Sequence, residues 1–166
     1  EEILLDEIVG AMMGLEGQFI RFHPMELGET NDDEEYVEPS GFGFASFAYI
    51  GGDLDSSHQN ILSRMLPLCS NYVHVNQYVS SCLGVYECGI VTRSLCEAIN
   101  KLLREYLEFV ANLNYLLREG DRDGKNISLS MVYVNSQPSI RTMAVLFQVV
   151  STVRGKKGGE LLNSLQ

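Results

Sequence analysis

The sequence predicts a mainly α-helical fold, a helical bundle with a small extended or hairpin element near the N-terminus. Apolar residues recur at steps of three and four along several long segments, which is the spacing of a helix face. Short alternating or aromatic runs are confined to the first third of the chain, and no alternation of strands and helices follows. With 166 residues, 45% of them hydrophobic, the chain is long enough to bury one substantial core.

The N-terminal segment predicts a short helix followed by a strand. Residues 2–13 place four apolar side chains at helical spacing, namely Ile3, Leu4, Ile8 and Met12. Gly14 and Gly17 interrupt that pattern. The run QFIRF at 18–22 then alternates polar and apolar residues as a strand does, and Pro24 closes it.

Residues 26–40 are predicted to form an acidic mobile loop, because they lack apolar periodicity. Seven acidic residues without any Lys or Arg stand between positions 26 and 38 and supply most of the formal charge of −10. This balance argues against binding to nucleic acid or to an anionic membrane, since both interactions need Lys and Arg. The aromatic, glycine-rich run at 41–52 favours an extended or hairpin element.

A long helix is predicted over residues 53–81, with Ser56 or Ser57 as its N-cap. Its apolar stripe advances in steps of three and four through Ile61, Met65, Leu68, Tyr72, Val75 and Val79. Pro67 lies inside the stripe, so we expect a kink there or two separate segments.

The clearest helical signal covers residues 90–117, and Gly120 is expected to end it. Two rows of apolar residues repeat every seven positions: Leu95, Leu102, Phe109 and Leu116, with Ile99, Tyr106 and Leu113 offset by four. Together they form a seam of the kind that packs helix against helix, and Leu103, Val110 and Leu117 widen it. We therefore predict six core positions on this seam: Leu95, Ile99, Leu102, Tyr106, Phe109 and Leu113.

Residues 129–153 predict a last long helix, in which Pro138 starts a new segment or introduces a kink. The run RGKKGG at 154–159 is expected to form a flexible basic turn. Between the last two helices, GDRDGKN at 120–126 has part of a calcium-loop pattern. It lacks the third ligand before Gly124 and the glutamate six residues after it, so we interpret it as a turn.

No catalytic, metal-binding or cofactor-binding residues are predicted. The four cysteines, at positions 69, 82, 88 and 96, form no C-x-x-C pair and are expected to be reduced and mostly buried. His23, His58 and His74 lie on separate elements without a flanking catalytic motif. The chain is therefore predicted not to be an enzyme and to need no cofactor.

Three blocks, in collinear order, resemble one known family. EEILLDEIVGAMMGLEGQFI at 1–20 resembles an opening helix that ends in G-[IVL]-[ED]-G-[KR]-[YF]-I. YECGIVTRSLCEAINKLLREYLEFVANL at 86–113 resembles the next family block, with Thr92 in place of the usual Asn. QPSIRTMAVLFQVVSTV at 137–153, followed by KGGELLNSLQ, is similar to the third. These blocks resemble the first Grip motif of the gamma-tubulin complex components, in a form closest to component two.

The resemblance implies that residues 1–166 are an N-terminal Grip domain, truncated at its C-terminal end. It implies a structural assembly module that contacts neighbouring complex components laterally and helps to build the template for microtubule nucleation. Gamma-tubulin would bind only through a C-terminal half that is absent from this chain. The resemblance also implies small helical adaptor proteins as partners. The implied location is the cytoplasm and cytoskeleton, at a microtubule organising centre such as the centrosome or the spindle pole.

The polar side of the helix at 90–117 supplies five candidate partner-binding residues: Arg93, Glu97, Asn100, Arg104 and Glu108. An ordinary solvated helix face is the alternative interpretation for all five. Two other functions are also open. One is a small helical domain that docks an adaptor helix in a groove, and the other is a Cys/His hydrolase, which would need a nucleophile beside a base.

Overall fold

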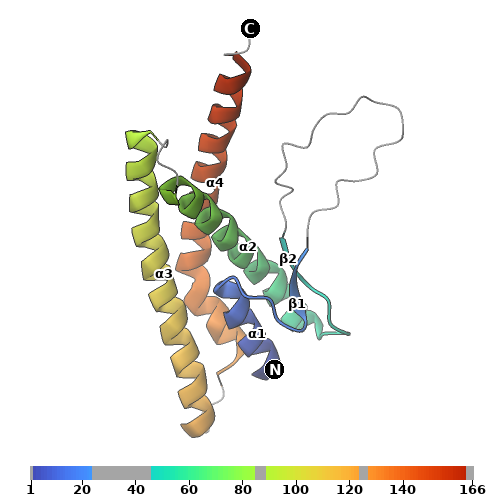
Figure 1. The fold of residues 1–166 in the computed structure, drawn as a ribbon. Coiled ribbons are helices and arrows are strands. Elements are labelled where there is room, and N and C mark those ends of the chain that lie inside the picture. Colours follow the sequence, from blue (N-terminus) through green and yellow to red (C-terminus); the bar gives the residue numbers. More distant parts are fainter. Residues whose placement is uncertain (1, 24–45, 85–88, 124–126, 164–166) are drawn as a thin grey trace, which may run out of the picture.

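The computed structural model describes residues 2–23, 46–84, 89–123 and 127–163 (Figure 1). In these residues four helices pack around one core, and a two-stranded antiparallel sheet lies beside them. The elements in chain order are α1 (Glu2–Met12), β1 (Ile20–His23), β2 (Ser46–Tyr49), α2 (Ser56–Gly84), α3 (Ile90–Asp123) and α4 (Leu129–Asn163). The predicted mainly helical fold with a small hairpin-like element is therefore confirmed. The predicted acidic loop at 26–40 lies outside the described residues.

Helix α2 is the central element of the bundle. It packs extensively against both α4 and α3, whereas α3 and α4 touch each other at few points. The two outer helices run side by side in opposite directions (Figure 1). At 34 and 35 residues, each is about 50 Å long. Two rods of this length, held apart by a third, leave long helix faces free of contacts within the described chain.

The N-cap of α2 differs from the residues that the sequence predicted. Asp55, and not Ser56 or Ser57, caps α2, because the Ser57 N–H donates to its carboxylate at 3.3 Å. Its backbone carbonyl also accepts the Gln59 N–H at 3.0 Å. Ser128 caps α4 in the same manner, since its hydroxyl oxygen accepts the Met131 N–H at 3.3 Å.

At four positions where the sequence predicted that a helix could divide or end, the helix continues. Both α2 and α4 run continuously through Pro67 and Pro138, so neither helix divides into two segments. Helix α3 passes Gly120, and α4 passes the glycines of 154–159, which the sequence predicted as a turn. A glycine costs a helix only about 1 kcal/mol relative to alanine. Extending a long existing helix avoids the cost of nucleation, which explains why these residues do not end it.

The two strands pair in one register, with Ile20 opposite Tyr49 and Phe22 opposite Phe47. The rings of Phe22 and Phe47 meet edge to face at 5.0 Å. Side-chain oxygens accept hydrogen bonds from the backbone N–H groups of both strands that point away from the partner strand. Ile20 donates to Glu7 at 2.9 Å, Phe22 to Glu16 at 2.8 Å, and Phe47 to the Ser70 hydroxyl at 2.9 Å.

The loop between α1 and β1 wraps around the Glu7 carboxylate. That carboxylate accepts N–H groups from Gln18, Phe19 and Ile20 at 2.7–3.1 Å. A Cβ atom at Gly17 would lie 2.7 Å from the same carboxylate, so a larger residue there would displace the Glu7 side chain from its backbone partners. Gly14 has φ of +82°, a conformation that L side chains rarely adopt. The two glycines that interrupt the helix pattern in the sequence are thus favoured in this turn, Gly14 by its backbone conformation and Gly17 by the nearby Glu7 side chain.

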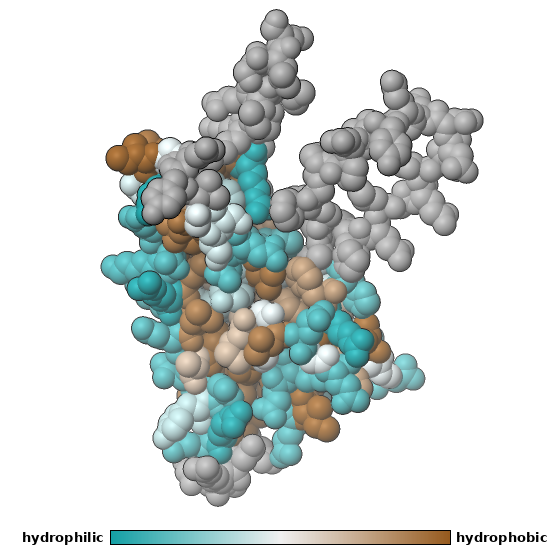
Figure 2. Space-filling view, in the orientation of Figure 1, coloured by the Kyte–Doolittle hydropathy of each residue, from teal (hydrophilic) through white to brown (hydrophobic). Residues whose placement is uncertain are grey.

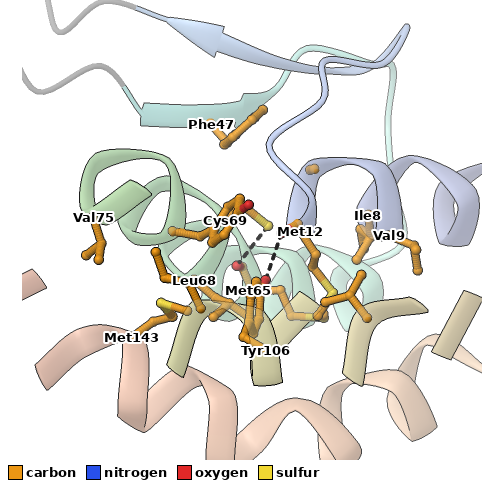
Figure 3. Packing of buried hydrophobic residues seen from close by; sticks show 14 of the residues in the cluster. Ile8, Val9, Met12, Phe47, Met65, Leu68, Cys69, Val75, Tyr106 and Met143 are labelled. Atoms are coloured by element: carbon orange, nitrogen blue, oxygen red, sulfur yellow. Dashed lines mark hydrogen bonds between the residues drawn. The ribbon is translucent and has the colours of Figure 1, made fainter. Parts of the chain in front are cut away.

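The core draws side chains from every helix and from both strands (Figure 3). At its centre the Tyr106 hydroxyl of α3 donates to the Met12 carbonyl at the end of α1, at 2.9 Å. The Tyr106 ring packs 5.1 Å from the ring of Tyr72 in α2. Around them lie the fully buried Met65, Leu68 and Cys69 of α2 and Met143 of α4.

On α3 three of the six predicted core positions are buried, namely Ile99, Tyr106 and Leu113, and at the other three the burial is shifted by one residue. The buried side chains are Cys96, Ile99, Leu103, Tyr106, Val110, Leu113 and Leu117. Of the predicted core positions, Leu95 and Phe109 are half-buried, and Leu102 is 40% exposed, so its core assignment is wrong. Two adjacent rows of α3 are apolar, and the central core covers the one through Leu103. Sequence periodicity alone does not distinguish these rows.

This shift predicts opposite outcomes for two neighbouring leucines. Leu103→Ala should lower the free energy of unfolding by about 2–5 kcal/mol, because Leu103 is only 2% exposed and its removal leaves a cavity. Leu102→Ala should lower it by about 1 kcal/mol or less, as exposed substitutions usually do. Urea unfolding followed by circular dichroism measures both. Equal losses would contradict the register described here.

A second prediction concerns the loop around Glu7. Gly17→Ala should destabilise the fold by about 1–3 kcal/mol, because the new methyl group displaces a carboxylate that holds three backbone N–H groups. In a Glu7→Ala background the same change should cost at least about 1 kcal/mol less, which a double-mutant cycle measures. Gly52→Ala is the matched control, since nothing lies within 4 Å of its Cβ position. Additive effects of the two substitutions would refute the steric coupling.

Candidate protein–protein interface

The five predicted partner-binding residues share one face of α3. At 100° per residue, all of them point away from the buried row that contains Tyr106. Arg93, Glu97, Arg104 and Glu108 are exposed, and Asn100 is half-buried. The structure thus brings the five together as a ridge along the outer side of a rod. Figure 2 shows hydrophilic side chains along this outer edge of α3, at the left of the view.

The charges on this ridge alternate in sign. Arg93 and Glu97 form an ion pair of 3.5 Å within one turn, with their side chains 47% and 62% exposed. Such exposed pairs contribute little to folding, typically about 0–1 kcal/mol. Their charges are therefore available to a partner with complementary charges, where they would favour fast association and correct register.

Tyr115, which the sequence pattern did not single out, lies on the same face of α3. Tyr115 stands seven residues after Glu108 and is 59% exposed. Its hydroxyl donates to Glu119 on the next turn, and this hydrogen bond raises the pKa of Tyr115. Tyrosine is one of the residue types enriched among the anchors of protein interfaces. The seven-residue spacing from Glu108 was the signal that could have identified it.

Histidine, cysteine and acidic side chains form no metal-binding group among the described residues. No group of three or more His, Cys, Asp or Glu side chains among them could hold a metal ion. His74 lies between the rings of Phe22 and Phe147, with centroids at 6.0 and 5.7 Å. A hollow of about 340 Å³ beside it has one acidic lining residue, and its lining comprises Gly14, Glu16, Phe22, Phe47, Val73 and Gln77. The lining contains no Ser, Thr, Cys, Lys or His side chain.

The described cysteines are buried thiols, as expected for core residues. Cys69, Cys82 and Cys96 are each buried and form no disulfide with one another. Burial raises the pKa of the Cys69 thiol to about 12, so its reactive thiolate form is scarce at neutral pH. Cys88 lies outside the described residues. No helix among the described residues has the length and hydrophobicity that a membrane span requires.

Comparison with known proteins supplies a family. A family model described as "Gamma tubulin complex component N-terminal" matches residues 5–166. Gamma-tubulin complex component 2 of Arabidopsis thaliana is 28% identical over 100% of this chain and 22% of its own length. The same component of Mus musculus is 26% identical, over 99% of this chain and 16% of its own length. Spindle pole body component alp4 of Schizosaccharomyces pombe is 25% identical, over 90% and 18%. The chain thus spans about a fifth of the length of these relatives.

The buried cysteines predict slow thiol chemistry. With Cys88 replaced by Ser, the three remaining thiols should react with a maleimide at pH 8 at least about a hundredfold more slowly than free cysteine, because each is buried in the folded core. Mass spectrometry of the labelled peptides measures each site. In denaturant all three should react at the free rate. Fast labelling of Cys69 in the folded protein would revive the hydrolase alternative.

Proposed function

This chain belongs to the gamma-tubulin complex component family, in which it is similar to component 2, and on that premise we propose that it is an assembly module. In this proposal it contacts neighbouring complex components laterally and so helps to build the template for microtubule nucleation. The observation that carries the proposal is the family match over residues 5–166, combined with the exposed, mixed-charge ridge of α3.

The geometry supports an assembly role over a chemical one. Long rods present extended ridges, and interfaces between stable partners need about 800 Å² on each side. The outer face of α3 offers such a ridge over a helix of 34 residues. The relatives named as complex or spindle pole body components support a location in the cytoskeleton at a microtubule organising centre. We propose the same location for this protein.

In this proposal, lateral assembly and contact with gamma-tubulin belong to different segments of a longer protein. Because this chain spans 16–22% of the length of its relatives, contact with gamma-tubulin would fall to a segment outside it. The described residues would then serve lateral assembly, without catalysis or a cofactor. Small helical adaptors are further partners under this proposal, as the family resemblance implies.

Capture of sister components by the tagged chain tests this proposal. Two arginines of the ridge, Arg93 and Arg104, are exchanged for Glu, which places negative charge where the ridge alternates in sign. Binding to the sister components should weaken at least about tenfold, equivalent to about 1.4 kcal/mol. Gamma-tubulin alone should not be captured by the unmodified chain.

The control is Arg21→Glu, an equal charge reversal on the exposed side of β1, away from α3. It should leave capture unchanged. If the double variant on α3 binds as well as the unmodified chain, the ridge is a solvated face and the lateral surface lies elsewhere. If the unmodified chain captures no sister component, the assembly role itself fails.

A further inference from the structure

Helices α3 and α4 enclose an apolar groove on the side that α2 does not cover. At its centre is a hollow of about 220 Å³. Its lining comprises Leu102, Glu105, Tyr106 and Phe109 of α3 and Pro138, Ser139, Thr142 and Met143 of α4. The hollow is open, because the two helices touch at few points. The 40% exposure of Leu102, which contradicted its predicted core position, is exposure to this groove.

The apolar lining extends well beyond the hollow along both helices. On α3 the same side carries a row at intervals of four and seven residues: Val91, Leu95, Leu102, Phe109 and Leu116. On α4 the facing row is Met131, Pro138, Thr142 and Val149, at intervals of seven, four and seven. Several members are strongly exposed, with Leu116 at 52% and Met131 at 54%. Two antiparallel walls with this repeat have the shape that receives a third helix.

The charge of the groove indicates a permanent occupant. Between residues 129 and 153, α4 carries a single charged side chain, Arg141, and the hollow is lined by a single one, Glu105. Transient partners are steered by complementary charge, whereas surfaces that are always covered resemble an interior. An apolar groove of this length, left open to water, would also favour aggregation. A segment of the same polypeptide would cover it at all times.

The chain that follows α4 is the segment best placed to do so. Helix α4 extends beyond the other helices, and its C-terminal end lies on the same side of the molecule as the start of α3 (Figure 1). In helical bundles consecutive helices are usually antiparallel neighbours joined by short loops. A helix that turns back after α4 would run along the groove. The relatives are far longer than this chain, which spans 16–22% of their length.

We propose that the stretch directly following Gln166 in the full-length protein forms an amphipathic helix that lies in the α3–α4 groove. Its apolar residues would recur at steps of three and four and pack between Leu102 and Phe109 on one wall and Pro138 and Thr142 on the other. The groove is then an internal interface of the longer protein. The mixed-charge ridge on the opposite side of α3 stays free, so this inference does not depend on the proposed assembly function.

Cysteine accessibility in the purified full-length protein tests the inference. Leu102→Cys reports on the groove, and Leu107→Cys is its control, because both are leucines of α3 with exposures of 40% and 37%. Met131→Cys and Gln148→Cys form a second pair on α4, because both residues are exposed and Gln148 points about 100° away from Met131 around the helix. Each groove cysteine should react with a maleimide at least about tenfold more slowly than its control, as measured peptide by peptide by mass spectrometry. Unchanged circular dichroism spectra show that the variants are folded.

A dilution experiment and a cross-linking experiment identify what occupies the groove. Protection that survives a hundredfold dilution without sister components indicates the same polypeptide, and a photo-cross-linking residue at position 102 should then join peptides that follow residue 166. Equal labelling of each pair would overturn the inference. So would protection lost on dilution, which indicates a second copy, or protection seen only with added components or adaptors. Cross-links to segments preceding residue 1 would overturn it too.

The ridge variants Arg93→Glu and Arg104→Glu should not change the labelling, which separates this test from that of the assembly function.

Discussion

The buried hydrogen bond from Tyr106 to Met12 is the contact that unites the first three helices. The Met12 carbonyl belongs to the last turn of α1, where a helix leaves its carbonyl groups without partners. Tyr106 satisfies this group from α3 while its ring packs on Tyr72 of α2. Burial raises the pKa of Tyr106, so the hydroxyl keeps its proton and remains a donor. A phenylalanine would fill the same space and leave a buried carbonyl unpaired.

The sequence predicted the fold class and every described helix and strand, because periodicity and glycine spacing are local signals. It did not predict which of two adjacent apolar rows on α3 is buried, since Leu102 and Leu103 differ only in what lies opposite them. It also placed the α2 cap on Ser56 or Ser57 instead of Asp55. Glycines in α3 and α4 were expected to end their helices, but both helices continue. The cost of a glycine is small beside that of stopping a long helix.

From the sequence, the candidate interface could be predicted only as one face of helix α3. Five polar residues could be assigned to one side of α3 from their spacing, and the structure places them together. Tyr115 was not assigned to this face, because an aromatic residue on an amphipathic helix resembles a core residue. The groove was not predictable at all. It arises because α2 holds α3 and α4 apart, an arrangement of three helices that no single helix encodes.

Side-chain oxygens accept hydrogen bonds from the outward-facing N–H groups of the small sheet. These contacts limit the pairing of its strands with strands of other chains. Exposed strand edges invite strands from other chains, and crowded assemblies make such mispairing more frequent. Glu7 and Glu16 occupy donors on one edge, and Ser70 occupies one on the other. The sheet is thereby a poor template for fibril growth. A strand from another molecule could pair with either edge only after these side-chain hydrogen bonds had broken.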